Sequence, residues 1–184
     1  MPALHHAITE LASEEAAERR LAASRLYIEG CMLADAATRA LCEDPDFAAL
    51  LLKPTTVGIA VHPITFENIR RANGMPRLAE VPPDQDAQEF ELHLGEVHLD
   101  ILTTRALGAS GAIAKFLEKF GDGIQQVEYF VKDVDRATEI LREKFGVRTI
   151  YPQTRPGADG TRVNFFLAST PENKKVLIEL VETS

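Results

Sequence analysis

Acidic, amide and imidazole side chains recur at every second position in several stretches of this sequence. Successive residues of a β-strand point to opposite faces, so this spacing gathers the polar side chains on one face of a predicted sheet, called here the polar face. It comprises Thr56, Gly58, Glu89, Glu91, His93, His98, Asp100, Gln126, Glu128, Asn164 and Glu179. Carboxylates and imidazoles transfer protons and bind metal ions, which makes the polar face a candidate site. An antiparallel sheet also presents a polar face to water, so a solvated surface is the alternative.

The strands that carry these residues belong to two copies of one βαβββ pattern. In the clearer copy, from Gly123 to Glu182, alternating apolar residues predict four strands, and helical spacing predicts a helix between Val134 and Phe145. The weaker copy follows Thr55. Its predicted elements are a strand beginning there, a helix over residues 65–72, strands over 88–94 and 97–103, and a linker helix over 110–120.

The two copies align with each other. Thr56 pairs with Gln126 in this alignment, and Asp100 pairs with Glu179. An internal repeat of this size predicts a pseudo-two-fold arrangement with the ligand site between the halves. We therefore expect an α+β fold in which two βαβββ modules form a curved eight-stranded cleft. The predicted boundaries are a helical extension over residues 1–53 and a domain over 54–184, with modules 55–104 and 123–184.

The N-terminal segment is helical in composition and carries no catalytic motif. Residues 7–42 predict two helices that break near Gly30, and Asp44 followed by Pro45 predicts a short helix that ends before Pro54. A cover for the sheet or a dimerisation element is the expected role. Cys31 and Cys42 lack a CxxC or nucleophile pattern, so reduced structural thiols are expected.

Composition limits the partners. The chain has 184 residues and a net charge of −8, which argues against binding to nucleic acid or to an anionic membrane surface. No apolar run is long enough to span a bilayer, and the first ten residues do not resemble a signal peptide. A cytoplasmic protein is expected, with a homodimer as a possible assembly.

Several segments carry a family resemblance. GDGIQQVEYFVKDVDRATEILREKFGVRTI, RPGADGTRVNFF and VLIELVE resemble the C-terminal half of methylmalonyl-CoA epimerase, a member of the vicinal oxygen chelate superfamily that includes glyoxalase I and extradiol dioxygenases. VGIAV, the turn from Val81 to Gln85 and ELHLGEVHLDIL support it in the first half. The resemblance covers residues 55–182 and leaves out the helical N-terminal segment.

The resemblance implies a divalent metal held by one ligand from each of four strands, generally two histidines, a Gln or Glu, and a terminal-strand Glu. Glu179 matches the terminal Glu, and Asp100, or Leu102 under another alignment, matches its counterpart in the first module. Both histidine positions differ, because they hold Thr56 and Gln126. The remaining Asp100, Gln126 and Glu179 offer oxygen alone, which would hold Mg or Mn weakly. No cofactor is therefore expected, and metal-dependent dioxygenase or glyoxalase chemistry is disfavoured.

The resemblance also implies two carboxylates that exchange the α-proton of a substrate, at positions matching Glu89 and Glu179. One carboxylate removes the α-proton from one side, which leaves a planar enolate. The other carboxylate returns a proton to the opposite side of that enolate. Burial beside like charges would raise the pKa of such a pair toward the working range. Glu128 adds a carboxylate that the epimerase pattern lacks.

Other polar residues are candidates for binding the substrate. The enolate oxygen needs hydrogen-bond donors, for which Gln126, Asn164 and His98 are candidates, and Thr56 lines the same predicted cleft. Arg155 and Arg162 flank the RPGADGTR turn and either contact a substrate phosphate or carboxylate or simply add solubilising charge.

These residues predict an isomerase, epimerase or lyase that transfers a proton next to a carbonyl, without the usual transition metal. The expected partner is a small carbonyl substrate, such as an acyl-CoA or a related carbonyl acid. One alternative is a non-catalytic small-molecule-binding or resistance protein of the same fold. Another is a metal-dependent member with rearranged ligands, such as Glu89, His98 or Glu128.

Overall fold

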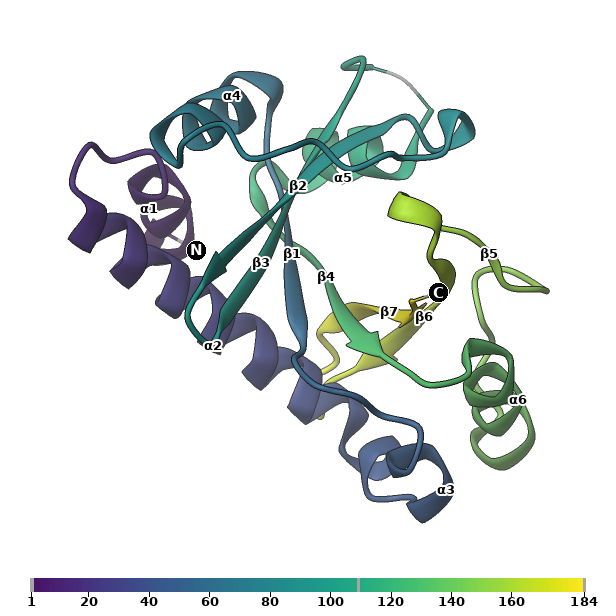
Figure 1. Cartoon of the computed structure of the whole chain (residues 1–184). Coiled ribbons are helices and arrows are strands. Elements are labelled where there is room, and N and C mark those ends of the chain that lie inside the picture. Colours follow the sequence, from purple (N-terminus) through teal and green to yellow (C-terminus); the bar gives the residue numbers. More distant parts are fainter. Residues whose placement is uncertain (1, 109, 184) are drawn as a thin grey trace. The chain divides into compact units, whose positions relative to one another are not determined.

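A computed structural model describes residues 2–108 and 110–183 of the chain (Figure 1). The chain divides into two compact units. The first unit comprises the residues up to Glu29 together with Thr56–Gln125, and the second comprises Gly30–Thr55 and the residues from Gln126 onward. The division at residue 53 into an extension and a repeat domain stays a prediction.

The first unit is built on three strands in the order β2-β3-β1. Strand β3 pairs antiparallel with β2 and parallel with β1. The elements are α1 (Pro2–Glu10), the first part of α2 (Ala16–Cys42), β1 (Thr56–Ala60), α4 (Pro63–Ala72), the 3-10 helix η1 (Pro83–Gln85), β2 (Ala87–Leu94), β3 (Val97–Thr104) and α5 (Ala112–Phe120). Gly95 joins β2 to β3 with a φ of 70°, a conformation that glycine adopts without strain.

The second unit has four strands in the order β4-β7-β6-β5. Strand β7 pairs parallel with β4 and antiparallel with β6, and β6 pairs antiparallel with β5. The elements are the rest of α2, α3 (Pro45–Ala48), β4 (Gly123–Phe130, whose first residues belong to the first unit), α6 (Val134–Phe145), β5 (Arg155–Pro156), the 3-10 helix η2 (Ala158–Gly160), β6 (Arg162–Ser169) and β7 (Lys175–Glu182).

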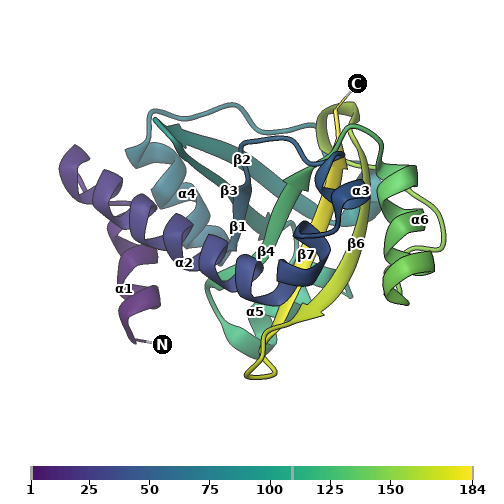
Figure 2. The ribbon, with the colours of Figure 1, turned by 90° about the horizontal axis from the view of Figure 1, so that it is seen from below.

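Helices cover the apolar face of the strands in each unit. In the first unit α4 lies against β3, and Phe66 packs edge-on against Phe90 of β2 with ring centroids 4.8 Å apart. In the second unit α6 lies alongside β6 (Figure 2), and its Ile140 and Leu141 are buried. The other face of each set of strands is therefore the polar face that the sequence predicts.

The described residues form seven strands, whereas the sequence predicts eight. Among its described residues the first unit has no fourth strand, because residues 75–82 run as an irregular segment. This segment donates the Ala79 N–H to the Glu89 carbonyl of β2 at 3.0 Å. Pro76 and Pro82 have no N–H to donate, so a regular ladder cannot form there. The α+β class is confirmed.

The predicted helix break near Gly30 is wrong. Helix α2 passes through Gly30, and the break lies at residues 11–15 instead. Ser13 lies just before α2, where its hydroxyl accepts the Glu15 N–H at 3.1 Å and donates to Glu18 at 2.6 Å. A helical glycine costs about 1 kcal/mol relative to alanine. Strong helix formers around Gly30 and a buried stripe that includes Leu26 and Ala34 outweigh that cost.

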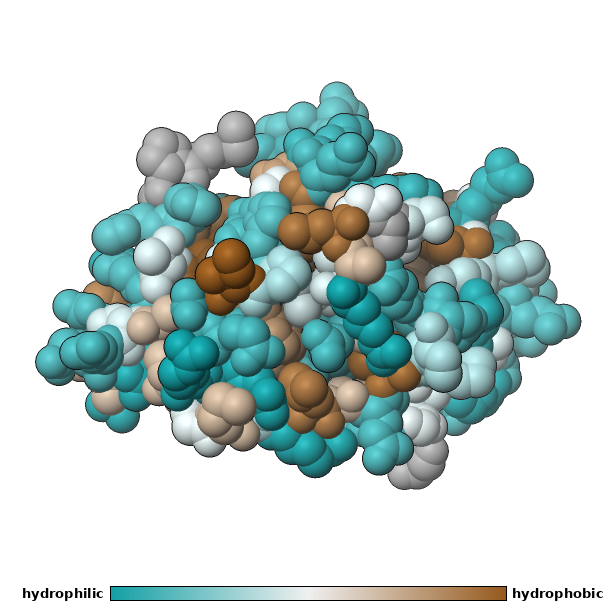
Figure 3. Space-filling view, turned by 90° about the horizontal axis from the view of Figure 1, so that it is seen from above, coloured by the Kyte–Doolittle hydropathy of each residue, from teal (hydrophilic) through white to brown (hydrophobic). Residues whose placement is uncertain are grey.

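Figure 3 shows one face of the molecule. On the face shown in Figure 3, apolar residues are interspersed with polar ones. Within residues 2–108 and 110–183, no helix has the length and apolar character needed to cross a membrane. Cys31 and Cys42 are both free thiols, as the sequence predicts.

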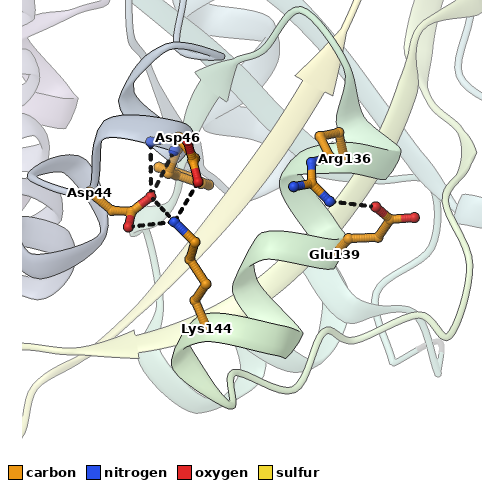
Figure 4. A network of polar contacts seen from close by, with 6 residues as sticks. Asp44, Asp46, Arg136, Glu139 and Lys144 are labelled. Carbon is orange, nitrogen blue, oxygen red and sulfur yellow. Dashed lines mark hydrogen bonds and ion pairs between the residues drawn. The ribbon is translucent and has the colours of Figure 1, made fainter.

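A lysine clamp fastens α3 to α6 in the second unit. The Lys144 ammonium of α6 donates to Asp44 at 2.9 Å and to Asp46 at 2.6 Å (Figure 4). Asp44 is also the N-cap of α3, accepting the N–H groups of Asp46 and Phe47. The Lys144 hydrogen bond is the main reason that the pKa of Asp44 lies below its usual value.

Candidate functional site

The polar face of the first unit carries the predicted carboxylates and histidines. Residues directly opposite each other in neighbouring strands share a face. Asp100 of β3 lies between Gly58 and Glu91, and in the next row Glu89 lies opposite Leu102. Asp100 is 6% exposed and Glu89 is half-buried. The prediction that these residues share one face is confirmed.

Two histidines contact each other on this face. His98 lies opposite His93 in the β2–β3 hairpin, with ring centroids 4.5 Å apart. His93 contacts Glu91 at 2.9 Å. Desolvation, with a further contribution from His93, lowers the pKa of His98 below its usual value. Neutral imidazole is therefore the favoured form of His98 near neutral pH.

The polar face of the second unit brings together Gln126, Glu128 and Glu179. Glu128 of β4 lies directly opposite Glu179 of β7, and Gln126 lies two residues earlier on the same face. The Gln126 Nε2 donates to Glu179 Oε2 at 2.5 Å and to Glu128 Oε1 at 3.3 Å. Gln126 and Glu128 are buried, and Glu179 is half-buried. We call these three residues the acid–amide cluster.

An arginine and two aromatic rings extend this face. Arg155 lies opposite Val163, and two residues further along β6 Phe165 lies opposite Glu179. The Arg155 guanidinium lies 4.8 Å from the centroid of the Tyr151 ring, and Tyr151 packs edge-on against Phe165 at 5.9 Å. Arg155 thus lies on the polar face, in a geometry suited to a cation–π contact.

The predicted location of Asn164 is wrong. Asn164 lies opposite Leu180, on the apolar face, and is fully buried. Its side chain accepts the Tyr151 N–H and donates to the Tyr151 carbonyl, both at 3.3 Å, and it also donates to Thr138 of α6 at 3.5 Å. The alternation within β6 is ambiguous, because Val163, Phe165 and Phe166 place apolar side chains on both faces. Asn164 thus holds the Tyr151 segment in place.

The sequence analysis missed Tyr151 and Phe165. Tyr151 belongs to an irregular segment without periodicity, and the run of two phenylalanines in β6 does not reveal which ring faces the site. Arg142 of α6 fixes this segment by donating to the Thr149 hydroxyl at 2.8 Å and to the Tyr151 carbonyl at 3.1 Å. An arginine in the third turn of a helix gives no sequence signal for this contact.

The residues at the metal positions implied by the resemblance do not fit a metal site. The amide of Gln126 turns its N–H groups, and not its oxygen, toward the carboxylates of Glu128 and Glu179. A metal needs electron-pair donors at that point. Among the described residues, no group of three or more His, Cys, Asp or Glu side chains is arranged to hold a metal ion.

Solved structures identify the family of this chain, although no protein-family model and no curated protein matches its sequence. The methylmalonyl-CoA epimerase of Mycobacterium tuberculosis is 33% identical, with a TM-score of 0.58. The match covers 73% of this chain and 88% of that epimerase. This chain belongs to the vicinal oxygen chelate superfamily, alongside the methylmalonyl-CoA epimerases.

Two further epimerase structures resemble this vicinal oxygen chelate protein. One is a variant of the Streptomyces coelicolor enzyme in complex with 2-nitronate-propionyl-CoA, at 30% identity and a TM-score of 0.59. The other is a methylmalonyl-CoA epimerase in complex with methylmalonyl-CoA and ammonium, at 30% identity and a TM-score of 0.58. Each match covers 73% of the present chain and 96% of the epimerase. The resemblance found in the sequence is therefore confirmed.

Proposed function

We propose that this protein is an epimerase or isomerase that moves the α-proton of an acyl-CoA thioester between two carboxylates. The observation that carries the proposal is the Glu179 carboxylate. It is held beside Phe165 on the polar face of a chain that shares its fold with methylmalonyl-CoA epimerases and is up to 33% identical to them over the matched part. Two of those epimerases are in complex with acyl-CoA compounds.

The proposed reaction uses Glu89 and Glu179 as an acid–base pair. The ionised member takes the α-proton as the C–H bond breaks, which leaves an enolate of the thioester. The protonated member then gives its proton to the opposite face of the carbanion centre, so the configuration inverts and the net charge is unchanged. Glu89 lies opposite Leu102 and Glu179 lies opposite Phe165, so each carboxylate has an apolar neighbour that limits its hydration.

Arg155 is proposed to bind an anionic group of the substrate. Its guanidinium is oriented by the Tyr151 ring, and Tyr151 is fixed in turn by Asn164 and Arg142. A pre-oriented guanidinium binds a carboxylate or a phosphate with two parallel hydrogen bonds. Both groups occur in carboxylated acyl-CoA thioesters. Catalytic roles for His98 and Glu128, a substrate contact by Thr56, a homodimer and a cytoplasmic location stay predictions.

The proposal is tested by solvent deuterium exchange into methylmalonyl-CoA and propionyl-CoA. The wild-type protein should incorporate one deuterium at the α-carbon of methylmalonyl-CoA and up to two at the α-carbon of propionyl-CoA, which carries two hydrogens. Glu89→Gln and Glu179→Gln should each lower the exchange rate about 10²- to 10⁴-fold, because each variant loses a proton carrier. Glu139→Gln, on the exposed surface of α6, is the control and should exchange at the wild-type rate. Full exchange in either test variant removes that residue from the mechanism.

A non-catalytic binding protein is the second candidate, and the aromatic pair Tyr151–Phe165 beside the carboxylates favours it. Aromatic rings at a site provide apolar contact area for a sequestered small molecule. The same assay separates the two functions. Saturable binding without exchange, across a panel of acyl-CoA thioesters and other carbonyl compounds, supports sequestration.

A further inference from the structure

Gln126 occupies an unusual place in the acid–amide cluster. Its side chain is buried, and its one amide nitrogen donates to carboxylates on two different strands. A carboxamide nitrogen carries two hydrogens, so both hydrogens are used in these contacts. The sequence makes Gln126 a candidate donor to an enolate oxygen, but this geometry directs its hydrogens to the protein's own acids.

The two acids that Gln126 joins need such a bridge. Glu128 and Glu179 lie opposite each other on adjacent parallel strands, whose backbones are about 4.8 Å apart. Like charges at this separation repel each other, and the partial burial of the pair limits screening by water. Two carboxylates this close, with no donor between them, either turn apart or share a proton. The direction in which Glu179 presents its oxygens therefore depends on what lies between the acids.

We propose that Gln126 is the positioning residue of this site. Its amide holds the Glu128 and Glu179 carboxylates side by side, with hydrogen-bond donors in the place where a small cation would otherwise bridge two acids. Gln126 thus acts on the reaction through Glu179 and does not contact the reacting atoms. The inference deepens the proposed function and rests on it for its kinetic consequence, whereas the bridging itself is independent of any substrate.

The experiment uses ammonium to replace the missing amide. Gln126→Ala removes the donors and opens a space between the acids, where ammonium can donate to both carboxylates. Thermal melting is measured in ammonium chloride and in tetramethylammonium chloride at equal ionic strength. Tetramethylammonium has the same charge but no N–H group. The melting temperature of Gln126→Ala should be lower than that of the wild type, and ammonium alone should raise it.

Two variants serve as controls in the melting experiment. Gln126→Met fills the space without supplying a donor, so its melting temperature should respond equally to both salts. Gln125→Ala removes a neighbouring carboxamide that alternation places on the opposite face of β4, and it should also show no preference for ammonium. Gln126→Ser is the second test variant if Gln126→Ala does not fold, because it also leaves a space that ammonium can enter.

Kinetics provide the second measurement. With methylmalonyl-CoA, Gln126→Ala should lower kcat by about 10- to 100-fold and change KM by less than about threefold, because a misdirected base slows the proton transfer without removing a substrate contact. Ammonium should restore a large part of kcat. If kcat/KM instead falls only because KM rises, while kcat is unchanged, Gln126 contributes to substrate binding and the inference is wrong.

The two arms separate the positioning role from the proposed function. If the wild-type protein exchanges no acyl-CoA proton, the proposed function fails, and the melting experiment still decides whether Gln126 bridges the acids. If the wild type is active but Gln126→Ala keeps full kcat and shows no ammonium-specific stabilisation, the positioning role is wrong and the proposed function stands.

Discussion

Thr38 and Tyr129 form a buried hydroxyl pair that tests how single polar groups support the second unit. Their oxygens are 2.9 Å apart, and Thr38 also donates to the Ala34 carbonyl. Both residues are buried, and burial raises the pKa of the Tyr129 phenol far above its usual value. The phenol is therefore a neutral donor to Thr38 at physiological pH.

Thr38→Val should destabilise the protein more than Tyr129→Phe does. The valine leaves the Tyr129 hydroxyl buried without a partner, which costs about 1–3 kcal/mol in the free energy of unfolding. The phenylalanine leaves Thr38 still bonded to Ala34, so a smaller loss of about 1 kcal/mol is expected. Urea denaturation of both variants and of the double variant measures the difference. Equal losses would show that water reaches the Tyr129 hydroxyl.

Removal of metal should leave the protein unchanged. Asp100, Gln126 and Glu179, which lie at metal positions implied by the resemblance, offer carboxylate and amide groups. The amide N–H groups of Gln126 donate to Glu128 and Glu179. We expect no stoichiometric transition metal in protein purified without added metal or chelator, and no change in melting temperature with EDTA. A stoichiometric metal that EDTA removes, with a fall in melting temperature, would restore metal-assisted chemistry and the rearranged ligand sets.

The single residues also show where sequence reasoning is limited. Alternation placed Glu89, Asp100, Gln126 and Glu179 correctly, because the residues directly before and after each acid, and the residue after Gln126, are largely apolar and define the opposite face. It failed at Asn164, whose strand is apolar on both faces. Alternation could not predict that Gln126 bridges Glu128 and Glu179, because the bridge depends on side-chain conformations across two strands. The type and spacing of residues thus predict which face of the sheet a side chain occupies, whereas packing determines which group it contacts.

At the scale of elements, the attachment of α3 to α6 depends on pH. The folded-state pKa of Asp44 is lowered, chiefly by its hydrogen bond with Lys144, relative to the ordinary value of 3.8. The stability that this contact contributes is therefore fully present above about pH 3.8, and it is lost as the pH falls through the lower folded-state pKa. Asp135 follows the same rule, because Arg162 lowers its pKa.

Asp44→Asn should weaken this pH dependence while keeping the start of α3. Asparagine is as good an N-cap as aspartate, but it lacks the charge that Lys144 contacts. We expect a smaller loss of stability between pH 5 and the acid range than in the wild type. Asp44→Ala loses the cap as well and should be the least stable of the three at neutral pH. Urea denaturation across this pH range provides the test. If the free energy of unfolding changes with pH equally in the wild type and in Asp44→Asn, the Lys144 contact does not stabilise the fold.

The elements were largely predictable, and the exceptions have physical causes. The helix predicted over residues 134–145 is found at Val134–Phe145, since Asp133 caps its start and Gly146 ends it with a φ of 63°. The break near Gly30 was predicted from one residue's propensity, which the packing of the whole helix overrides. The missing strand in the first unit reflects prolines, whose effect on a ladder outweighs alternation.

At the scale of the whole molecule, the proposed reaction uses two carboxylates that lie far apart in the sequence, Glu89 and Glu179. If both act on one substrate, either single Gln variant already loses the proton transfer that needs the pair. The exchange rate of the double variant Glu89→Gln/Glu179→Gln should then be little lower than that of the less active single variant. The effects of two groups that act in the same step are not additive. Deuterium exchange rates of the three variants provide the test. Multiplicative losses would indicate that the two residues act independently.

The prolines beside β2 have another consequence. β2 is the outermost strand of its unit, and an outermost strand with unpaired backbone groups can recruit a strand from another chain and start aggregation. Here the segment that contains Pro76 and Pro82 lies along β2 through the Ala79–Glu89 hydrogen bond. In the second unit the outermost strand, β5, is only two residues long and ends in Pro156. The irregular segment that stands in place of the expected eighth strand thus covers part of β2. It leaves few unpaired backbone groups there for a strand of a second molecule.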